Sequence, residues 1–97
     1  MKVASRRWTA TDGRRGVTHY FWCPGCESGH GPTDAWEYNG DAERPTFSPS
    51  ILVRGGSRNL VCHSFVRDGQ IEFLGDCTHR LAGQTVPLPD VPDWMRR

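Results

Sequence analysis

The sequence predicts a small all-β domain of short antiparallel strands, arranged as two small sheets or as one curled sheet and stapled through its cysteines. Glycine and proline supply 11 and 7 of the 97 residues and are spread along the whole chain, so long helices have no room. β-Branched and aromatic residues form short runs between these turn signals. Four cysteines offer the cross-link that so lean an apolar core needs.

A length of 97 residues and a net charge of +1 describe a single folded domain, residues 1–97. A second core would need a longer chain, and the small net charge argues against a chain kept unfolded by self-repulsion. We expect the core within about residues 17–88 and a proline-rich C-terminal tail at 87–97. Three prolines between positions 87 and 92 predict that this tail wraps the surface without regular strand pairing.

The first elements are strands bounded by turns. Residues 17–22 are β-branched and aromatic, and they predict a strand that leads into the first cysteine pair. Residues 35–38 run into Asn39-Gly40, the strongest two-residue signal for a hairpin turn. A strand pair is therefore expected around residues 35–44.

Residues 44–50 carry two prolines, which fix φ and bias the preceding residues toward extended geometry. The default interpretation is structural, a stiff segment along a sheet edge. The alternative is a recognition surface, because its three hydroxyls form a polar ridge that can be shared with Trp36, His63 and Asp76. Residues 51–53 continue as a strand.

The stretch 60–77 predicts a hairpin whose two-residue turn is Asp68-Gly69. This turn places Arg67 opposite Gln70. Because the turn fixes the register of a hairpin, it also determines every other residue pair between the two strands.

Successive side chains of a strand point to opposite faces, so the predicted register also sorts the hairpin by face. Cys62 and Cys77 become diagonal neighbours on one face, close enough for both sulfurs to meet one metal after a small bend. His63 and Asp76 become diagonal neighbours on the other. One face carries Leu60, Cys62, Ser64, Val66, Ile71, Phe73 and Cys77, and the other carries Val61, His63, Phe65, Glu72, Leu74 and Asp76.

The cysteines predict a metal centre. Cys23–Cys26 has the sequence CPGC, a knuckle whose tight turn aims two thiolates at one point, as tetrahedral zinc requires. Cys62 and Cys77 complete four sulfurs through the hairpin register. Close cysteine spacing in a reducing compartment favours metal over disulfides. Four thiolates suit zinc or iron, and zinc is the expected cofactor.

Three histidines are alternative ligands. His79 or His63 can replace one of the later cysteines in a mixed site, and His30 lies in a loop near the knuckle. His63 has a second interpretation, because a His63–Asp76 pair can either fix an imidazole tautomer for catalysis or satisfy a half-buried polar group.

Binding to nucleic acid is a further alternative, with arginines near both ends of the chain and aromatic side chains as stacking platforms. The 11 acidic residues nearly cancel the 12 basic ones, so the chain as a whole has no strong attraction to phosphates. The residues concerned are Arg6, Arg7, Arg14, Arg15, Arg96 and Arg97 with Trp8, Tyr20 and Trp22.

No apolar run is long enough to span a bilayer, and residues 1–7 lack the apolar stretch of a signal peptide. We therefore expect a cytoplasmic protein with no membrane partner. An oligomer would suit so lean a core.

The chain contains five specific motifs: CPGC (23–26), PTFSPS (45–50), CHSFV (62–66), DCTH (76–79) and LAGQTV (81–86). CPGC and the hairpin pair CHSFV and DCTH hold the cysteines. Together the five motifs resemble a family of short proteins encoded by tailed phages and prophages, whose function is not established. The likeness covers about residues 20–88. It implies action in the cytoplasm of an infected bacterium. Some family members carry an ammonia monooxygenase label, which the small size of this chain excludes.

Two function classes follow from these patterns. The first is a non-enzymatic phage accessory protein that binds a host or phage macromolecule, most simply a protein, because four thiolates leave no open position on a metal. The alternative is a small zinc-dependent hydrolase in which His63 and Asp76 act as general base beside the metal.

Overall fold

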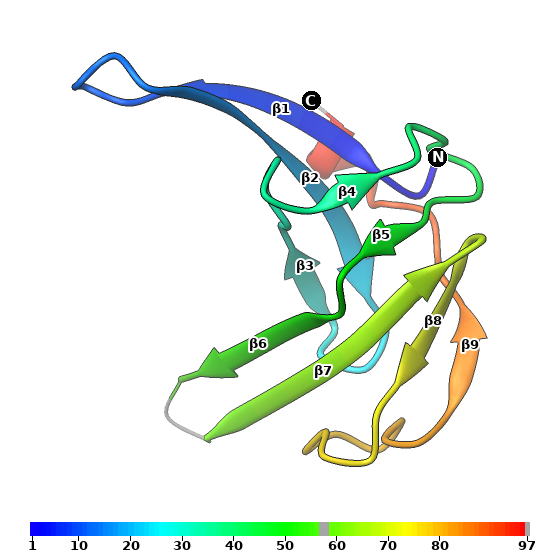
Figure 1. The fold of residues 1–97 in the computed structure, drawn as a ribbon. Coiled ribbons are helices and arrows are strands. Elements are labelled where there is room, and N and C mark those ends of the chain that lie inside the picture. Colours follow the sequence, from blue (N-terminus) through cyan, green and yellow to red (C-terminus); the bar gives the residue numbers. More distant parts are fainter. Residues whose placement is uncertain (57–58, 97) are drawn as a thin grey trace.

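Antiparallel strands make up nearly all of the regular structure, which confirms the predicted all-β class. The structure is a computed structural model that describes residues 1–56 and 59–96. The strands form three small sheets rather than two sheets or one curled sheet (Figure 1). The first sheet contains β1 (Ala4–Thr9), β2 (Arg15–Cys23) and β3 (Ser28–His30), the second β4 (Glu37–Tyr38) and β5 (Phe47–Ser48), and the third β6 (Ile51–Gly55), β7 (Leu60–Arg67), β8 (Gln70–Phe73) and β9 (Thr85–Pro87).

The longest strand, β2, contains the predicted strand 17–22 and ends at Cys23. Its β-branched and aromatic residues fit a pleated, partly buried surface. β1 pairs with the first part of β2, and β3 pairs with the last part of β2, where Phe21 lies opposite His30. Figure 1 shows the β1–β2 hairpin reaching away from the other sheets, whereas the end of β2 passes close to β7. The first cysteine pair is thereby delivered to the four-stranded sheet.

The four-stranded sheet has the order β6-β7-β8-β9, and its central hairpin has the predicted register. Arg67 pairs with Gln70 and Ser64 pairs with Phe73. The predicted assignment of faces is also confirmed, since Cys62 is fully buried whereas His63 is partly exposed. Asp68 and the following glycine both adopt positive φ, as a two-residue turn between twisted strands requires.

The strand pair expected around residues 35–44 is wrong in its second strand. Tyr38 pairs with Phe47, so the connection is a loop of residues 39–46 rather than a two-residue turn. Side chains hold this loop: the Asn39 amide oxygen accepts the N–H of Thr46, and its amide nitrogen donates to the Arg44 carbonyl. The Asn39 N–H also donates to the Thr46 carbonyl at 3.2 Å, so these contacts hold Asn39 opposite Thr46 across the longer loop.

The tail expected to lie unpaired also differs from the prediction. Pro87 belongs to β9 and pairs with Gln70, and Leu88 donates its N–H to the Gly69 carbonyl at 2.9 Å. Proline fits here because β9 is an edge strand, where a missing N–H breaks no ladder. Leu88 is completely buried and Val91 is 4% exposed, so the tail contributes to the core.

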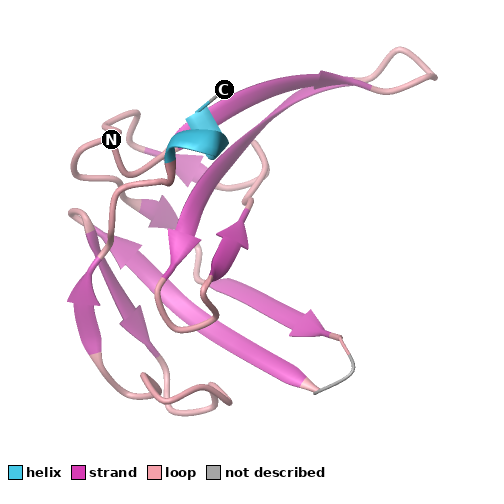
Figure 2. Cartoon of the chain, turned by 180° about the vertical axis from the view of Figure 1, so that it is seen from behind, coloured by secondary structure: helices cyan, strands magenta, loops and turns pink. Residues whose placement is uncertain are grey.

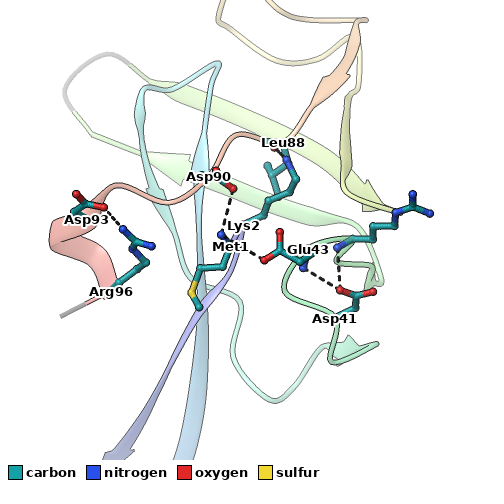
Figure 3. Close-up of polar contacts among 9 residues, drawn as sticks. Met1, Lys2, Asp41, Glu43, Leu88, Asp90, Asp93 and Arg96 are labelled. Carbon is teal, nitrogen blue, oxygen red and sulfur yellow. Dashed lines mark hydrogen bonds and ion pairs between the residues drawn. The ribbon is translucent and has the colours of Figure 1, made fainter.

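Both ends of the described chain meet on one side of the fold (Figures 2 and 3). The Met1 ammonium lies 3.3 Å from Asp90 and 3.5 Å from Glu43, and the Lys2 ammonium donates to the Leu88 carbonyl. Figure 2 shows η1 (Asp93–Arg96) against β1 and β2, where Met95, Val91 and Ala4 form a small second core.

The main core lies between β2, β5 and the four-stranded sheet, and all four cysteines contact it. No helix of the described residues is long and apolar enough to cross a membrane. The buried members of this core are Val3, Phe21, Cys23, Phe47, Ile51, Cys62, Val66, Ile71, Phe73, Cys77, Leu81 and Leu88.

Candidate active site and metal centre

A serine, a histidine and an aspartate lie in line on the outer face of the four-stranded sheet. The Ser50 Oγ is 3.0 Å from His63 Nε2, and the Asp76 carboxylate is 3.2 Å from His63 Nδ1. The Asp76 carboxylate accepts a hydrogen bond from Nδ1–H, which leaves Nε2 without a proton and able to accept the hydrogen bond of the Ser50 hydroxyl. This arrangement of nucleophile, base and orienting carboxylate is the one that activates serine in hydrolases.

Strand register brings the three residues together. His63 lies on β7 opposite Leu52 of β6, and Ser50 comes two residues before Leu52, so it shares the face of His63 as a diagonal neighbour. On the other side, the chain turns after β8 and carries Asp76 back toward His63, as the predicted hairpin register requires. The Trp36 indole donates to the Ser50 carbonyl at 3.3 Å and holds the serine backbone.

The site is open to solvent. The His63 side chain is 26% exposed and that of Asp76 is 55% exposed. Ser50 is partly buried, and Leu52 beside it is 46% exposed. A substrate can therefore reach the serine hydroxyl, and water partly screens the histidine–aspartate pair.

Beneath the same strand, on its inner face, cysteine and histidine side chains form a buried cluster. Cys23, Cys26, His30 and Cys62 offer four ligand atoms that all lie within 4.8 Å of one another. The knuckle turn brings the first two together, with the Cys26 N–H donating to Cys23 Sγ at 3.3 Å. The Cys23 and Cys62 sulfurs are 3.8 Å apart, and all four cysteines of the chain are free. This group can hold a metal ion.

Histidine tautomers separate two of the candidate ligands. The His30 Nδ1–H lies 3.2 Å from the Gly29 carbonyl, so its Nε2 carries the lone pair, and this buried Nε2 has no hydrogen-bond partner among the described residues. His79 is the reverse: its Nδ1 accepts the Leu81 N–H, which leaves Nε2–H to donate to Cys62 Sγ at 3.5 Å. His30 therefore fits a metal ligand, and His79 fits a donor to a ligand sulfur.

The thiols of this cluster differ in acidity. A hydrogen bond from Cys62 lowers the pKa of Cys23 to about 4, and the same bond raises the pKa of Cys62. Burial raises the pKa of Cys26 to about 11. These shifts favour the thiolate form at Cys23 and the thiol form at Cys26 and Cys62, whose protons a bound cation would replace.

Cys77 belongs to a second group, with Cys62 and His79, and not to the group that contains Cys23. Its sulfur lies 3.2 Å from both the N–H and the carbonyl of His63. The His63 imidazole, an alternative metal ligand in the sequence prediction, is in neither group and faces Ser50 and Asp76 instead.

A family model described as bacterial ubiquitination-like system serine protease (BubE) matches residues 2–74. The chain belongs to the BubE family. Searches of curated proteins and of solved structures find no match. The matched region of this BubE-family chain includes Ser50, His63 and the four residues of the first metal-binding group, and it ends two residues before Asp76.

The predicted site residues of the BubE-family chain thus form two sites on opposite faces of β7, one around His63 and the other around Cys62. His63 and Asp76 meet as the register predicts. From the sequence, Ser50 is predicted only as part of the polar ridge of residues 44–50, and its contact with His63 is not predicted. Its period-2 spacing from Leu52 is the signal that places it on the face of His63.

The described arginines of the nucleic-acid alternative lie on the β1–β2 hairpin and on η1 of the BubE-family fold. Arg6 and Arg7 lie on β1, Arg14 and Arg15 lie at the start of the β2 side of the hairpin, and Arg97 lies outside the described residues. Three of them are engaged within the chain, and two of these contacts are made from the hairpin: Arg6 donates to the Met95 carbonyl, and Arg14 pairs with Asp12. Arg96 pairs with Asp93 in η1, and the platforms Trp8, Tyr20 and Trp22 lie on β1 and β2.

Proposed function

We propose that this chain is a serine hydrolase that cleaves an acyl bond in a protein substrate, with Ser50 as nucleophile, His63 as general base and Asp76 as the residue that orients the base. One observation carries the proposal: the unbroken line from Ser50 Oγ through both ring nitrogens of His63 to the Asp76 carboxylate. The description of the BubE family as serine proteases supports it.

The geometry assigns each proton. As Ser50 Oγ bonds to the substrate carbonyl carbon, its proton passes to His63 Nε2, 3.0 Å away. Asp76 stabilises the resulting imidazolium through Nδ1–H. His63 then gives the proton to the leaving amine, which departs and leaves an acyl group on Ser50. Water repeats the sequence: His63 takes its proton, the hydroxyl attacks the ester, and Ser50 leaves with the proton returned.

We assign zinc to the buried cluster, with Cys23, Cys26, His30 and Cys62 as ligands. Three thiolates and one imidazole nitrogen are a common donor set of structural zinc, and the orphaned Nε2 of His30 supports this choice over four thiolates. When bound, the ion supplies a cross-link and no reactive position, since four protein ligands close its tetrahedron. It would tie β2 and β3 to β7 directly beneath His63.

The biological setting is part of the same proposal. The family description refers to a bacterial ubiquitination-like system, and we infer that the partner of this chain is a protein of such a system, met as substrate. The phage or prophage origin that the motifs suggest is part of this proposal. Four free thiols fit the reducing bacterial cytoplasm.

An active-site label tests the proposed nucleophile. A fluorophosphonate probe should form one adduct per chain, detected by intact mass and located on Ser50 by peptide mapping. Ser50→Ala should abolish the adduct, and so should His63→Ala. Ser48→Ala is the matched control, since Ser48 is exposed, lies two residues away and makes no hydrogen bond to His63 in the described structure. An adduct on Ser48, or labelling that survives Ser50→Ala, would refute the assignment.

A further inference from the structure

Both His63 and Asp76 have a cysteine as their direct neighbour in sequence, Cys62 in one case and Cys77 in the other. Neighbouring side chains of a strand point to opposite faces, so on β7 His63 faces outward while Cys62 faces the core. Asp76 lies in the turn after β8 and its side chain is 55% exposed, whereas the cysteine that follows it is buried. Cys62 takes part in the metal-binding group. Cys77 is 9% exposed and is not in that group; in the proposed zinc site His30 takes the ligand position that the sequence predicts for Cys77.

Cys77 instead contacts the backbone of His63 twice. Its sulfur accepts the His63 N–H at 3.2 Å, and its S–H donates to the His63 carbonyl at 3.2 Å. That carbonyl also accepts the Leu74 N–H at 2.9 Å. The thiol therefore occupies the place of a strand neighbour for His63.

The reason for this contact is a break in the β7–β8 ladder. Regular pairing stops after Phe73, the chain makes a turn that includes Asp76, and pairing resumes where Thr78 donates to the Val61 carbonyl at 2.9 Å. The excursion swings the Asp76 carboxylate to His63 Nδ1, but it removes a regular backbone partner from His63. Cys77, at the end of this turn, supplies the missing hydrogen-bond partner, because its sulfur accepts the His63 N–H.

We infer that Cys77 is a positioning residue for the triad, whose thiol clamps the His63 backbone to the end of the turn that carries Asp76. The inference rests on the proposed function. It assigns the fourth cysteine to alignment of the catalytic base rather than to the metal. A misplacement of about 1 Å at reacting atoms costs about 100-fold in rate, so loss of the clamp should reduce turnover more than substrate binding.

The chain contains a matched control one residue away. The Thr78 hydroxyl bridges Val61 as Cys77 bridges His63: it accepts the Val61 N–H at 3.1 Å and donates to the Val61 carbonyl at 3.3 Å. Thr78→Val removes the same pair of hydrogen bonds on the same strand, two residues from His63. Cys77 is buried and Thr78 is exposed, so Cys77→Ala also loses core packing. A loss of kcat that Cys77→Ser repairs and Thr78→Val lacks is therefore specific to the clamp.

The experiment compares Cys77→Ala, Cys77→Ser and Thr78→Val in zinc content, melting temperature, and kcat and KM for a nitrophenyl ester. Cys77→Ala should keep one zinc per chain, lower kcat by about 10- to 100-fold and change KM by less than about 2-fold. Cys77→Ser should recover most of kcat, because a hydroxyl can donate and accept in the same place. Thr78→Val should leave kcat nearly unchanged, whatever its effect on the melting temperature.

Two results would overturn the inference. Loss of zinc in both Cys77 variants would make this residue a metal ligand. Equal loss of kcat in Cys77→Ala and Thr78→Val would show only general destabilisation. Failure of the proposed function looks different, since the wild-type protein would then form no fluorophosphonate adduct on Ser50. Amide exchange by NMR reads the clamp without activity: Cys77→Ala should speed exchange of the His63 N–H about 10-fold, and unchanged exchange would count against the contact.

Discussion

Replacing Asp76 with asparagine tests how strongly the carboxylate supports His63. The carboxylate lies 3.2 Å from Nδ1, a separation worth about 1.3 kcal/mol in bulk water and about 5 kcal/mol at an effective dielectric constant of about 20. Because the Asp76 side chain is 55% exposed, solvent screening places the loss in the lower half of this range, at about 1.4 to 2.7 kcal/mol. Asp76→Asn should therefore lower kcat about 10- to 100-fold.

The assay is ester hydrolysis with the rate of Ser50 acylation measured in parallel, and zinc content checks that the fold is intact. Asp68→Asn is the control: it makes the same change at the turn of the same hairpin, where φ is 49° and asparagine is well tolerated. Unchanged activity of Asp76→Asn would remove the aspartate from the triad. A loss of about 10⁴-fold, as in triads whose aspartate is buried, would refute the reasoning from exposure.

Three further outcomes are expected. Cys26→Ser should lower zinc content and melting temperature together, measured by elemental analysis and thermal unfolding; a metal-free protein with an unchanged transition would contradict the zinc staple. Zinc uptake at pH 8 should release two thiol protons, from Cys26 and Cys62, because the pKa of Cys23 lies at about 4 and those of the other two are raised above their ordinary value; calorimetry in buffers of different ionisation enthalpy counts them, and three would be inconsistent. Leu88→Ala should cost about 2–5 kcal/mol in denaturant unfolding, since this side chain is completely buried, and a cost below about 1 kcal/mol would show that the tail does not belong to the core.

Much of the candidate site could be predicted from one turn. Asp68-Gly69 sets the register of β7 and β8, and the register places His63 with Asp76 on one face and buries Cys62 on the other. Ser50 could not be placed in the same way, because the strand that follows it, β6, is joined to β7 by a loop whose length sets no unique register. Only the three-dimensional structure shows that Leu52 pairs with His63 and thereby places Ser50 on the face of His63.

The metal ligands and the course of the tail could not be predicted fully, because both depend on how the elements pack in three dimensions. Nothing in the local sequence of His30 separates a ligand from a surface histidine, since the distinction lies in which ring nitrogen is buried without a partner. Likewise, three prolines in the tail indicate irregular backbone, but the burial of Leu88 depends on the core position beside Gly69. The hairpin expected at 35–44 was wrong because the side chain of Asn39 bonds across a longer loop.

The alternation of Cys62 and His63 along β7 makes this strand intolerant of insertions and deletions. One residue added or removed between the hairpin turn and His63 would exchange the faces, sending the imidazole into the core and a metal-ligand thiol into solvent. Such a change would eliminate both sites at once, although each single substitution nearby would affect only one. Additions at the exposed turn between β1 and β2 would shift neither. In variants of this chain, strand β7 should therefore differ by substitution and keep its length.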